Sequence, residues 1–206
     1  MPSVCSALCA PILIMPVAAR ANHRASTKRS TPMEPMTLTT IAAALAAPFP
    51  REVISLLPGA TTQDKARCLA MPYADVRAYE ARLDDVAGVA AWESDYQMTA
   101  RGVVCKLTIC GVTKSAIGDY PADPKDENAG TSAQAQAFKR ACAAFGIGRY
   151  LYNLPATWCS YDQAARRVTN PDRVVWEMYS KAGLLSAEER RRPPAVEGQG
   201  GSAGRR

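Results

Sequence analysis

Histidine is almost absent from this sequence, and several motifs that mark catalysis are missing. The 206 residues contain one histidine, His23, close to the N-terminus. The chain has no Gly-x-x-x-x-Gly-Lys-Ser/Thr phosphate-binding loop and no carboxylate cluster of the nuclease type. These absences argue against nucleotide hydrolysis and histidine-based catalysis. We therefore predict a protein that is not an enzyme, with no catalytic residues, no cofactor and no bound metal.

Cysteine occurs seven times, but no two cysteines form a Cys-x-x-Cys pair. Cys105 and Cys110 lie on one predicted strand, where their side chains point to opposite faces and cannot share a metal. An odd number of cysteines scattered along the chain indicates a reduced, cytoplasmic protein. A thiol-dependent enzyme that uses Cys142 or Cys159 is disfavoured, because Cys142 falls on the buried side of a predicted helix and no base is near in sequence.

The longest apolar run near the N-terminus, from Ala7 to Ala19, is too short to span a bilayer. No positive charge precedes it, as a signal peptide requires. The acid-free stretch suits an organelle-targeting peptide in a eukaryote, or else an upstream or misassigned start before Met33 or Met36. We predict a disordered or misassigned extension at 1–35, one folded domain at 36–185, and a disordered Arg/Gly/Pro tail at 186–206.

The formal net charge of +6 is concentrated at the two ends of the chain. Residues 1–32 hold four cations and no acid, and residues 187–206 hold five arginines against three glutamates. Residues 33–186 are therefore formally neutral, so bulk basicity does not argue for nucleic acid, and an anion site has to be a local patch. The cations of two stretches poor in acids are Arg101, Lys106 and Lys114, then Lys139, Arg140, Arg149, Arg166, Arg167 and Arg173.

Hydrophobic periodicity predicts an α+β domain built around an antiparallel β-meander. The expected elements are a helix from Thr37 to Pro48, a brief strand at 65–73, a helix at 75–87, strands at 92–98, 103–109 and 112–120, a polar loop at 121–131, a helix at 132–145, and a C-terminal helix at 171–182. The three consecutive strands have short connections, which makes them antiparallel. Ser132 is the expected N-cap of the helix at 132–145, and Gly146 is its expected C-terminal stop.

The helix at 132–145 therefore starts after Ser132 in this prediction. Phe138, Cys142 and Phe145 follow at spacings of four and three, so they face the core, and Ala141 fills the seam between them. Trp92 is likewise assigned to core packing.

The segment "AFKRACAAFGIGRYLYNLP" at 137–155 has two interpretations. In the first, Lys139 and Arg140 lie on the flank and outer face of the helix and hold a phosphate chain, with Arg149 returning to the same area. Tyr150 and Tyr152 then stack on bases. In the second, the Lys-Arg pair belongs to a solvated helix face, and the glycine that follows is an ordinary cap.

The longer string "SAQAQAFKRACAAFGIGRYLYNLP" resembles the signature segment of the Rad-fifty-two-type single-strand annealing proteins, in particular their bacterial and phage DdrA-like branch. Three further segments agree in the same order. They are "LAAPFP" at 45–50, "YADVRAYEARLDDVAGVAAW" ahead of the meander, and "VVCKLTI" within it. The resemblance covers roughly residues 38–160, which is most of the predicted domain.

The resemblance implies an αβββα fold whose helix lies on a curved sheet, with subunits assembled into a homo-oligomeric ring or filament. It implies an ATP-independent protein of recombination and double-strand break repair that binds single-stranded DNA and anneals complementary strands. The DNA backbone would lie in a basic groove with its bases outward. Other implied partners are a single-strand binding protein or a recombinase, in the cytoplasm at the nucleoid and away from membranes.

The resemblance also implies which residues contact DNA. Lys139, Arg140 and Arg77 match basic positions of the family, whereas a third cation found in some members is replaced here by Ala143. Because this cation is missing, Arg149, or Lys106 and Arg101, are expected to contribute more to DNA binding. The full predicted set is Lys139, Arg140, Arg149, Arg77, Lys106, Arg101, Tyr150 and Tyr152.

Two questions stay open at this point. The missing third cation and the neutral domain also fit an oligomeric scaffold or a DNA-end protection protein of the same fold without annealing activity. Arg166 and Arg167 fit either an outer electrostatic site or a polar hairpin, and we favour the hairpin.

Overall fold

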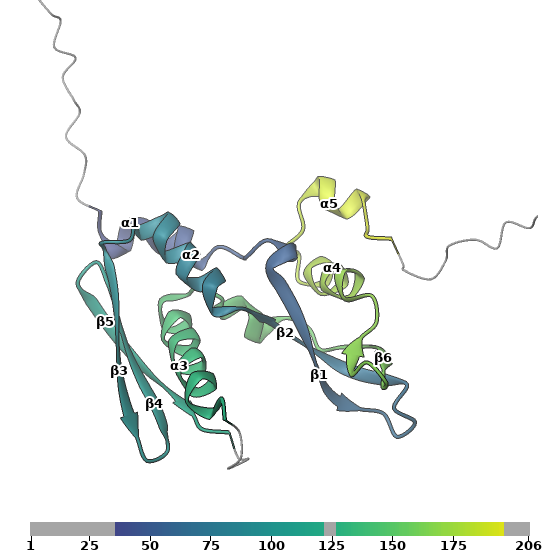
Figure 1. The fold of residues 1–206 in the computed structure, drawn as a ribbon. Coiled ribbons are helices and arrows are strands. Elements are labelled where there is room, and N and C mark those ends of the chain that lie inside the picture. Colours follow the sequence, from purple (N-terminus) through teal and green to yellow (C-terminus); the bar gives the residue numbers. More distant parts are fainter. Residues whose placement is uncertain (1–35, 122–126, 196–206) are drawn as a thin grey trace, which may run out of the picture. The chain divides into compact units, whose positions relative to one another are not determined.

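The computed structural model describes residues 36–121 and 127–195 of the chain. The predicted extension at 1–35, part of the predicted polar loop and the end of the predicted tail lie outside the described residues. The described part is a mixed α+β fold with antiparallel sheets, which confirms the predicted fold class (Figure 1). Its elements are α1 (Leu38–Ala46), η1 (Arg51–Val53), β1 (Ile54–Thr61), β2 (Arg67–Ala74), α2 (Val76–Ala87), β3 (Trp92–Thr99), β4 (Gly102–Ile109), β5 (Val112–Asp119), α3 (Ala129–Phe145), η2 (Arg149–Asn153), β6 (Thr157–Asp162), β7 (Arg167–Val168), α4 (Pro171–Lys181) and α5 (Ala187–Arg191).

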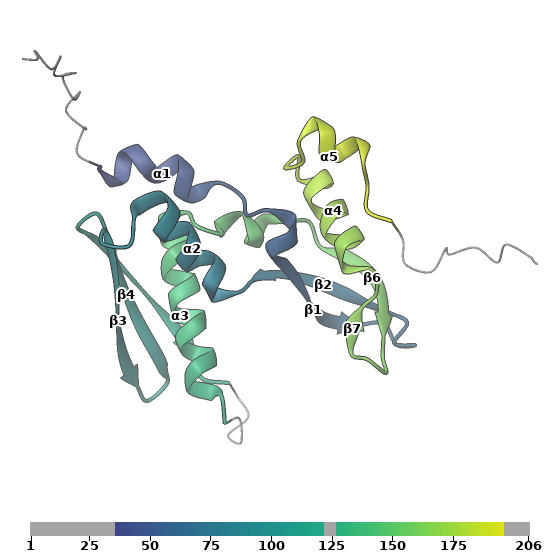
Figure 2. The same cartoon turned by 45° about the horizontal axis from the view of Figure 1, so that its top comes forward.

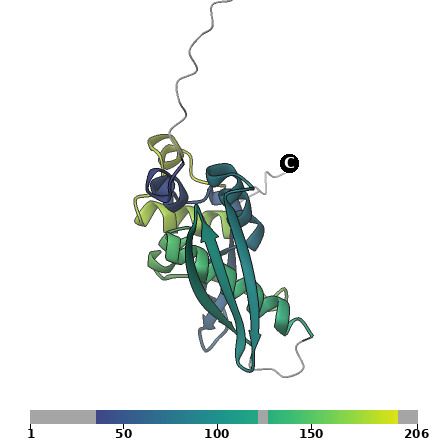
Figure 3. The same ribbon diagram turned by 90° about the vertical axis from the view of Figure 1, so that its left-hand side faces the viewer.

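Strands β3, β4 and β5 form the predicted antiparallel meander, and α3 covers one of its faces (Figure 3). Alternate residues of β4, namely Cys105, Leu107 and Ile109, are fully buried on that face. The helix approaches β5 so closely that a Cβ atom at Gly118 would overlap the carbonyl oxygen of Ala133. A glycine in the strand therefore allows backbone-to-backbone packing that any side chain would prevent.

Helix α3 begins at Ala129, which corrects the predicted start after Ser132. The backbone N–H of Ser132 donates to the carbonyl oxygen of Asn128 at 2.9 Å, so a helical turn already precedes Ser132. The predicted end is confirmed, because Gly146 adopts the left-handed conformation with φ of 104°. The predicted core residues of the helix are all buried: Phe138, Ala141, Cys142 and Phe145.

A second antiparallel sheet has the strand order β1-β2-β6-β7, and β2 is the only one of its strands to which the sequence analysis gave a range. Strand β1 contains Pro58 and Gly59, two residues that are unfavourable in strands, and its register shifts between Pro58 and Thr61. These residues concealed the strand in the sequence. Strands β6 and β7 form a hairpin whose turn contains Arg166, as the favoured interpretation of this segment predicted.

Helix α4 covers one face of the second sheet (Figure 2). The helix follows its prediction, with Pro171 in its first turn and Gly183 beyond its end. The buried residues of this contact are Cys68, Ala70, Cys159, Val168, Val174 and Met178.

The predicted tail from residue 186 starts too early, because residues 187–191 form α5. Ser186 and Glu189 make a reciprocal capping box at its N-terminus. The helix is attached to the domain by Arg51, whose Nε donates to Glu189 Oε1 at 3.1 Å, and by Trp176, whose Nε1 donates to the Glu189 carbonyl at 3.0 Å. The sequence prediction missed these partners because Arg51 lies far away along the chain.

A closed hydrogen-bond network joins three segments of the domain. Tyr179 of α4 donates to the carbonyl oxygen of Phe49 at 3.0 Å, and the N–H of Phe49 donates to the Tyr150 hydroxyl at 3.1 Å. Because the hydroxyl hydrogen of Tyr179 is already used, Tyr150 donates to the Tyr179 oxygen at 2.7 Å. The network holds η2 and α4 against the segment that follows α1.

Candidate nucleic-acid interface

The two adjacent cations of α3 reach toward different neighbours. Lys139 extends toward β2, where its Nζ lies 5.8 Å from the centroid of the Tyr73 ring. Arg140 extends toward β5 and contacts Ile117 and Asp119. Successive helical residues are rotated by about 100°, which separates the two side chains on the helix surface. Lys139 therefore lies beside the sheet that contains β2, and Arg140 lies beside the meander.

Lys139 is a half-buried cation. Burial lowers the pKa of its ammonium group, and the negative charge of Asp75 acts in the opposite direction. Within the described residues, no carboxylate oxygen comes within 4.0 Å of its Nζ. A partly desolvated ammonium group without such an ion pair is well suited to bind a phosphate and donate hydrogen bonds to it.

Arg140 already has a partner in the protein. Its Nη1 donates to Asp119 Oδ2 at 2.9 Å and to the carbonyl oxygen of Ile117 at 2.7 Å. The ion pair is not buried, because 40% of the Arg140 side chain and 63% of the Asp119 side chain are exposed. A phosphate that binds Arg140 therefore competes with a solvent-exposed carboxylate.

Arg77 lies in the first turn of α2, and 88% of its side chain is exposed. Its Nη1 lies 3.7 Å from Oδ1 of Asp75, the N-cap of the helix. Asp75 is also the carboxylate that acts on the pKa of Lys139. Asp75 thus interacts electrostatically with both Arg77 and Lys139.

Arg149 and Lys114 meet at the C-terminal end of α3. Arg149 donates from Nε to the carbonyl oxygen of Ala143 at 2.7 Å and from Nη2 to that of Ala144 at 2.8 Å. Lys114 donates to the same Ala144 oxygen at 2.7 Å. Both cations satisfy carbonyl groups at the negative end of the helix dipole. This capping role was missed in the sequence, which assigned Arg149 to DNA.

Lys106 and Arg101 do not join the cations of α3. Lys106 lies between Asp95 and Ser115 on β4, and its neighbours Cys105 and Leu107 are buried under α3. Side chains alternate along a strand, so Lys106 projects from the opposite face of the meander. Arg101 is exposed in the turn between β3 and β4.

The two predicted stacking residues have different environments. Tyr150 is half-buried, its ring lies edge-on to Tyr179 at 6.0 Å, and its hydroxyl belongs to the network with Phe49. These contacts give Tyr150 a structural role, and its stacking on a base stays a prediction. Tyr152 on η2 is 69% exposed and remains accessible.

Tyr73 is the neighbour of Lys139 that sequence reasoning missed. A period of two runs through β2, where Cys68 and Ala70 are buried while Met71 and Tyr73 lie on the other face. The signal was present in the strand "RCLAMPYA". The alternation alone does not show that Tyr73 lies beside Lys139, because this requires α3 to pack next to that face of β2. Only the tertiary contact with Lys139 reveals this packing.

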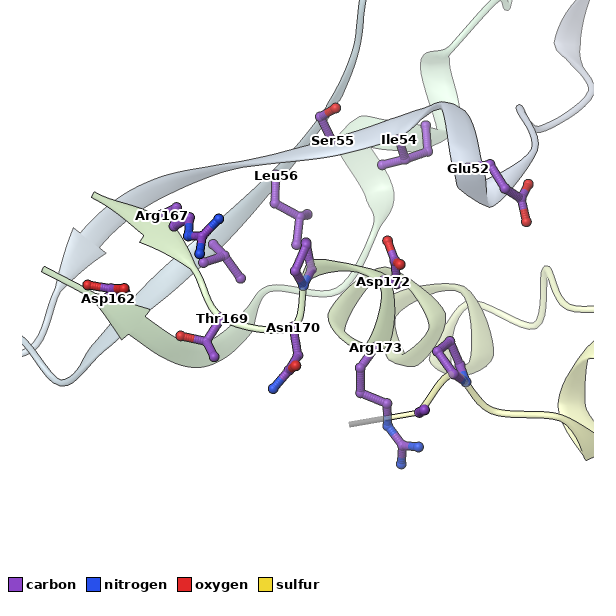
Figure 4. Close-up of a pocket in the computed structure, with 14 residues that line it drawn as sticks. Glu52, Ile54, Ser55, Leu56, Asp162, Arg167, Thr169, Asn170, Asp172 and Arg173 are labelled. Carbon is purple, nitrogen blue, oxygen red and sulfur yellow. The ribbon is translucent and has the colours of Figure 1, made fainter. Parts of the chain in front are cut away.

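A cavity of about 760 Å³ lies elsewhere, between β1, β7 and the start of α4 (Figure 4). Three acids and two arginines line it, which gives no consistent charge for an anionic ligand. These charged residues are Glu52, Asp162, Asp172, Arg167 and Arg173. None of the predicted DNA-binding residues lines this cavity.

The buried thiols have no activating surroundings. Burial raises the pKa of Cys142 and that of Cys159, the latter to about 12, so both thiols are protonated near neutral pH. Among residues 36–121 and 127–195 no group of three His, Cys, Asp or Glu side chains is placed to hold a metal ion. No helix in the same ranges has the length and apolar character needed to cross a membrane.

The comparison with known proteins identifies a family. The family described as Rad52/22 double-strand break repair proteins matches residues 37–169, which run from α1 through β7. The chain belongs to this family. The resemblance inferred from the sequence is thereby confirmed.

Two curated relatives are similar to the chain over most of its length. The single-stranded DNA-binding protein DdrA of Deinococcus deserti is 34% identical over 148 residues, which cover 68% of this chain and 70% of that protein. The single-stranded DNA-binding protein DdrA of Deinococcus radiodurans is 36% identical over 135 residues, which cover 64% of each protein.

Proposed function

We propose that this protein binds single-stranded DNA through its phosphates and anneals complementary strands during double-strand break repair, without ATP. The observation that carries the proposal is Lys139, a half-buried cation of α3 with no carboxylate within 4.0 Å among the described residues. Membership of the Rad52/22 family and similarity to two single-stranded DNA-binding proteins support it.

The proposed contact explains how one surface serves both binding and annealing. Phosphate contacts carry no sequence information, so any strand is held with similar affinity. The Watson–Crick edges of the bases then stay free to pair with a second strand. No covalent bond is made or broken in this process, and the role asks for no nucleophile and no general base.

The proposed interface consists of Lys139, Arg77 and Arg140, with Arg140 shared with Asp119. Three cations in a formally neutral domain give weak binding from one subunit. We propose that a homo-oligomeric ring or filament repeats this small patch along one strand. Connected sites raise the effective concentration of each further contact, which converts weak contacts into stable binding.

The test is a titration of labelled oligonucleotides by fluorescence anisotropy at several salt concentrations. Lys139→Ala is expected to weaken binding to all sequences equally and to reduce the log–log salt slope by about 0.7 for the lost phosphate contact. The matched control is Lys181→Ala, which removes an exposed lysine from the end of α4. Parental affinity and slope in Lys139→Ala would refute the interface.

A second candidate function is DNA-end protection or scaffolding without annealing. It is favoured by Ala143, which stands where some family members have a third cation, and by the engagement of Arg140 with Asp119. Fluorescent complementary oligonucleotides, mixed without nucleotide or metal, separate the candidates. Accelerated annealing supports the first function. Binding without acceleration supports protection, and the lack of both supports a scaffold.

A further inference from the structure

The second sheet has a face that α4 does not cover. Residues of β1, β2 and β6 alternate between the buried contact with α4 and this opposite face. We call it the apolar face and define it by Leu57, Leu69, Met71, Tyr73 and Trp158. Leu57, Met71 and Trp158 are 48%, 45% and 43% exposed, which is high for large apolar side chains gathered on one surface.

Strand register makes these side chains neighbours. Leu57 of β1 is directly opposite Met71 of β2, and Leu69 of β2 is directly opposite Trp158 of β6. Tyr73, Met71 and Leu69 follow one another at intervals of two residues along β2. From Tyr73 to Leu69 the strip is roughly 14 Å long, because a strand rises about 3.4 Å per residue.

Cations stand at both ends of the strip. Lys139 lies over the ring of Tyr73 at one end. Arg67 occupies the same face at the other end, where its Nη2 donates to the carbonyl oxygen of Trp158 at 2.9 Å. Each cation has an acid in its surroundings, Asp75 for Lys139 and Asp64 for Arg67. Asp64 is engaged locally, because it accepts hydrogen bonds from Thr62 and from the backbone of residue 66.

We propose that the apolar face stacks nucleobases of the same DNA strand whose phosphates contact Lys139, with Trp158 as its main stacking residue. The inference rests on the proposed function. A flat apolar strip between two cations complements a polymer in which flat bases alternate with anionic phosphates. Stacking uses the faces of the bases and leaves their pairing edges uncovered, so it is compatible with annealing.

The sheet explains why Trp158 is available for this role. It follows Thr157 and precedes Cys159, and both of these neighbours are buried on the side of α4. Strand alternation therefore directs Trp158 away from the core. The Arg67 guanidinium donates to the backbone carbonyl of this residue.

The decisive experiment compares a thymine oligonucleotide with an abasic strand of the same length, in the full-length protein. The parent is expected to bind the abasic strand about 5- to 150-fold more weakly, the range for the loss of one stacked base. Trp158→Leu is expected to lose affinity for the thymine strand by a factor in this range and to bind both strands nearly equally. Trp158→Phe is expected to restore most of the difference.

Two further readouts separate stacking from other roles. The salt slope of Trp158→Leu should equal that of the parent, because no phosphate contact is removed, whereas Lys139→Ala reduces it. Met71→Ser should weaken binding, whereas Met98→Ser, which changes an exposed methionine of the meander, should not.

The possible failures are distinguishable. If the parent binds no single-stranded DNA, the proposed function fails. If the parent binds and Lys139→Ala weakens binding while Trp158→Leu equals the parent on both strands, the stacking inference fails and the proposed function stands. If Trp158→Leu changes the oligomeric mass in gel filtration and leaves the thymine-to-abasic ratio at the parental value, the face joins copies of the chain, and the inference is overturned.

Discussion

The exposed ion pair between Arg140 and Asp119 makes a sharp prediction about DNA affinity. If a phosphate competes with Asp119 for the guanidinium, removing the negative charge of Asp119 should tighten binding. Asp119→Asn keeps the shape of the side chain and an oxygen that accepts from Nη1, but the neutral amide holds the guanidinium less strongly. We expect this variant to bind single-stranded DNA more tightly than the parent.

The expected size follows from the exposure of the pair. The two charged atoms are 2.9 Å apart, but 40% and 63% of the side chains are exposed. Ion pairs of this kind contribute about 0–1 kcal/mol, so the affinity should rise by at most about fivefold. The free energy of unfolding should fall by no more than the same amount. The gain should shrink at high salt, where exposed charges are screened.

The assay is oligonucleotide anisotropy on four proteins: the parent, Asp119→Asn, Arg140→Ala and the double variant. The gain in affinity should disappear when Arg140 is absent, because the carboxylate then has no cation to release. Asp95→Asn, which lies opposite Lys106 in the strand register and outside the contact with Arg140, controls for the general loss of one negative charge. The reasoning is refuted if the double variant keeps the gain or if the control shows an equal one.

Two stability predictions follow from contacts outside the interface. Gly118→Ala places a Cβ atom against the backbone of α3, so urea denaturation should show a loss of about 3 kcal/mol, whereas Gly130→Ala meets no atom within 4 Å and should be neutral or stabilising by up to about 1 kcal/mol. A loss below about 0.5 kcal/mol in Gly118→Ala would contradict the close packing. Hydrogen bonds from Ser186 and the Arg51 guanidinium lower the pKa of Glu189 from 4.5 to about 2, so its stabilising effect is complete above pH 4.5 and lost as the pH falls toward 2. In thermal denaturation across this range, the Tm difference between the parent and Glu189→Gln should therefore close, and a constant difference would count against the capping contact.

The local elements of the fold were predictable where the sequence pattern is strong. The meander follows from alternation at residues such as Cys105 and Leu107, and α3 ends at Gly146 because glycine accepts the left-handed conformation. Strand β1 was hidden by Pro58 and Gly59, whose local preferences are overridden by pairing with β2. The local preferences of single residues do not reveal which strands pair.

The candidate site was predictable as a set of residue types and only partly as an arrangement. Arg77 and Lys139 were both predicted to contact DNA, and in the structure both interact electrostatically with Asp75. Arg149 and Tyr150 were predicted to contact DNA, and in the structure Arg149 donates to a carbonyl group at the end of α3 while Tyr150 belongs to a hydroxyl network. The partners that occupy them could not be identified before the chain segments were placed in space.

The amino-acid sequence determined the order of the main helices and strands, the family, and the segment that carries Lys139 and Arg140, because periodicity, caps and motifs depend on residues close together in the chain. The tertiary structure alone decided which cations are engaged by the protein, which side of the meander Lys106 occupies, and that Lys139 meets an apolar face bearing Trp158. Burial, ion pairing and the joining of faces are properties of surfaces brought together from distant segments, and they appear only when the chain has folded.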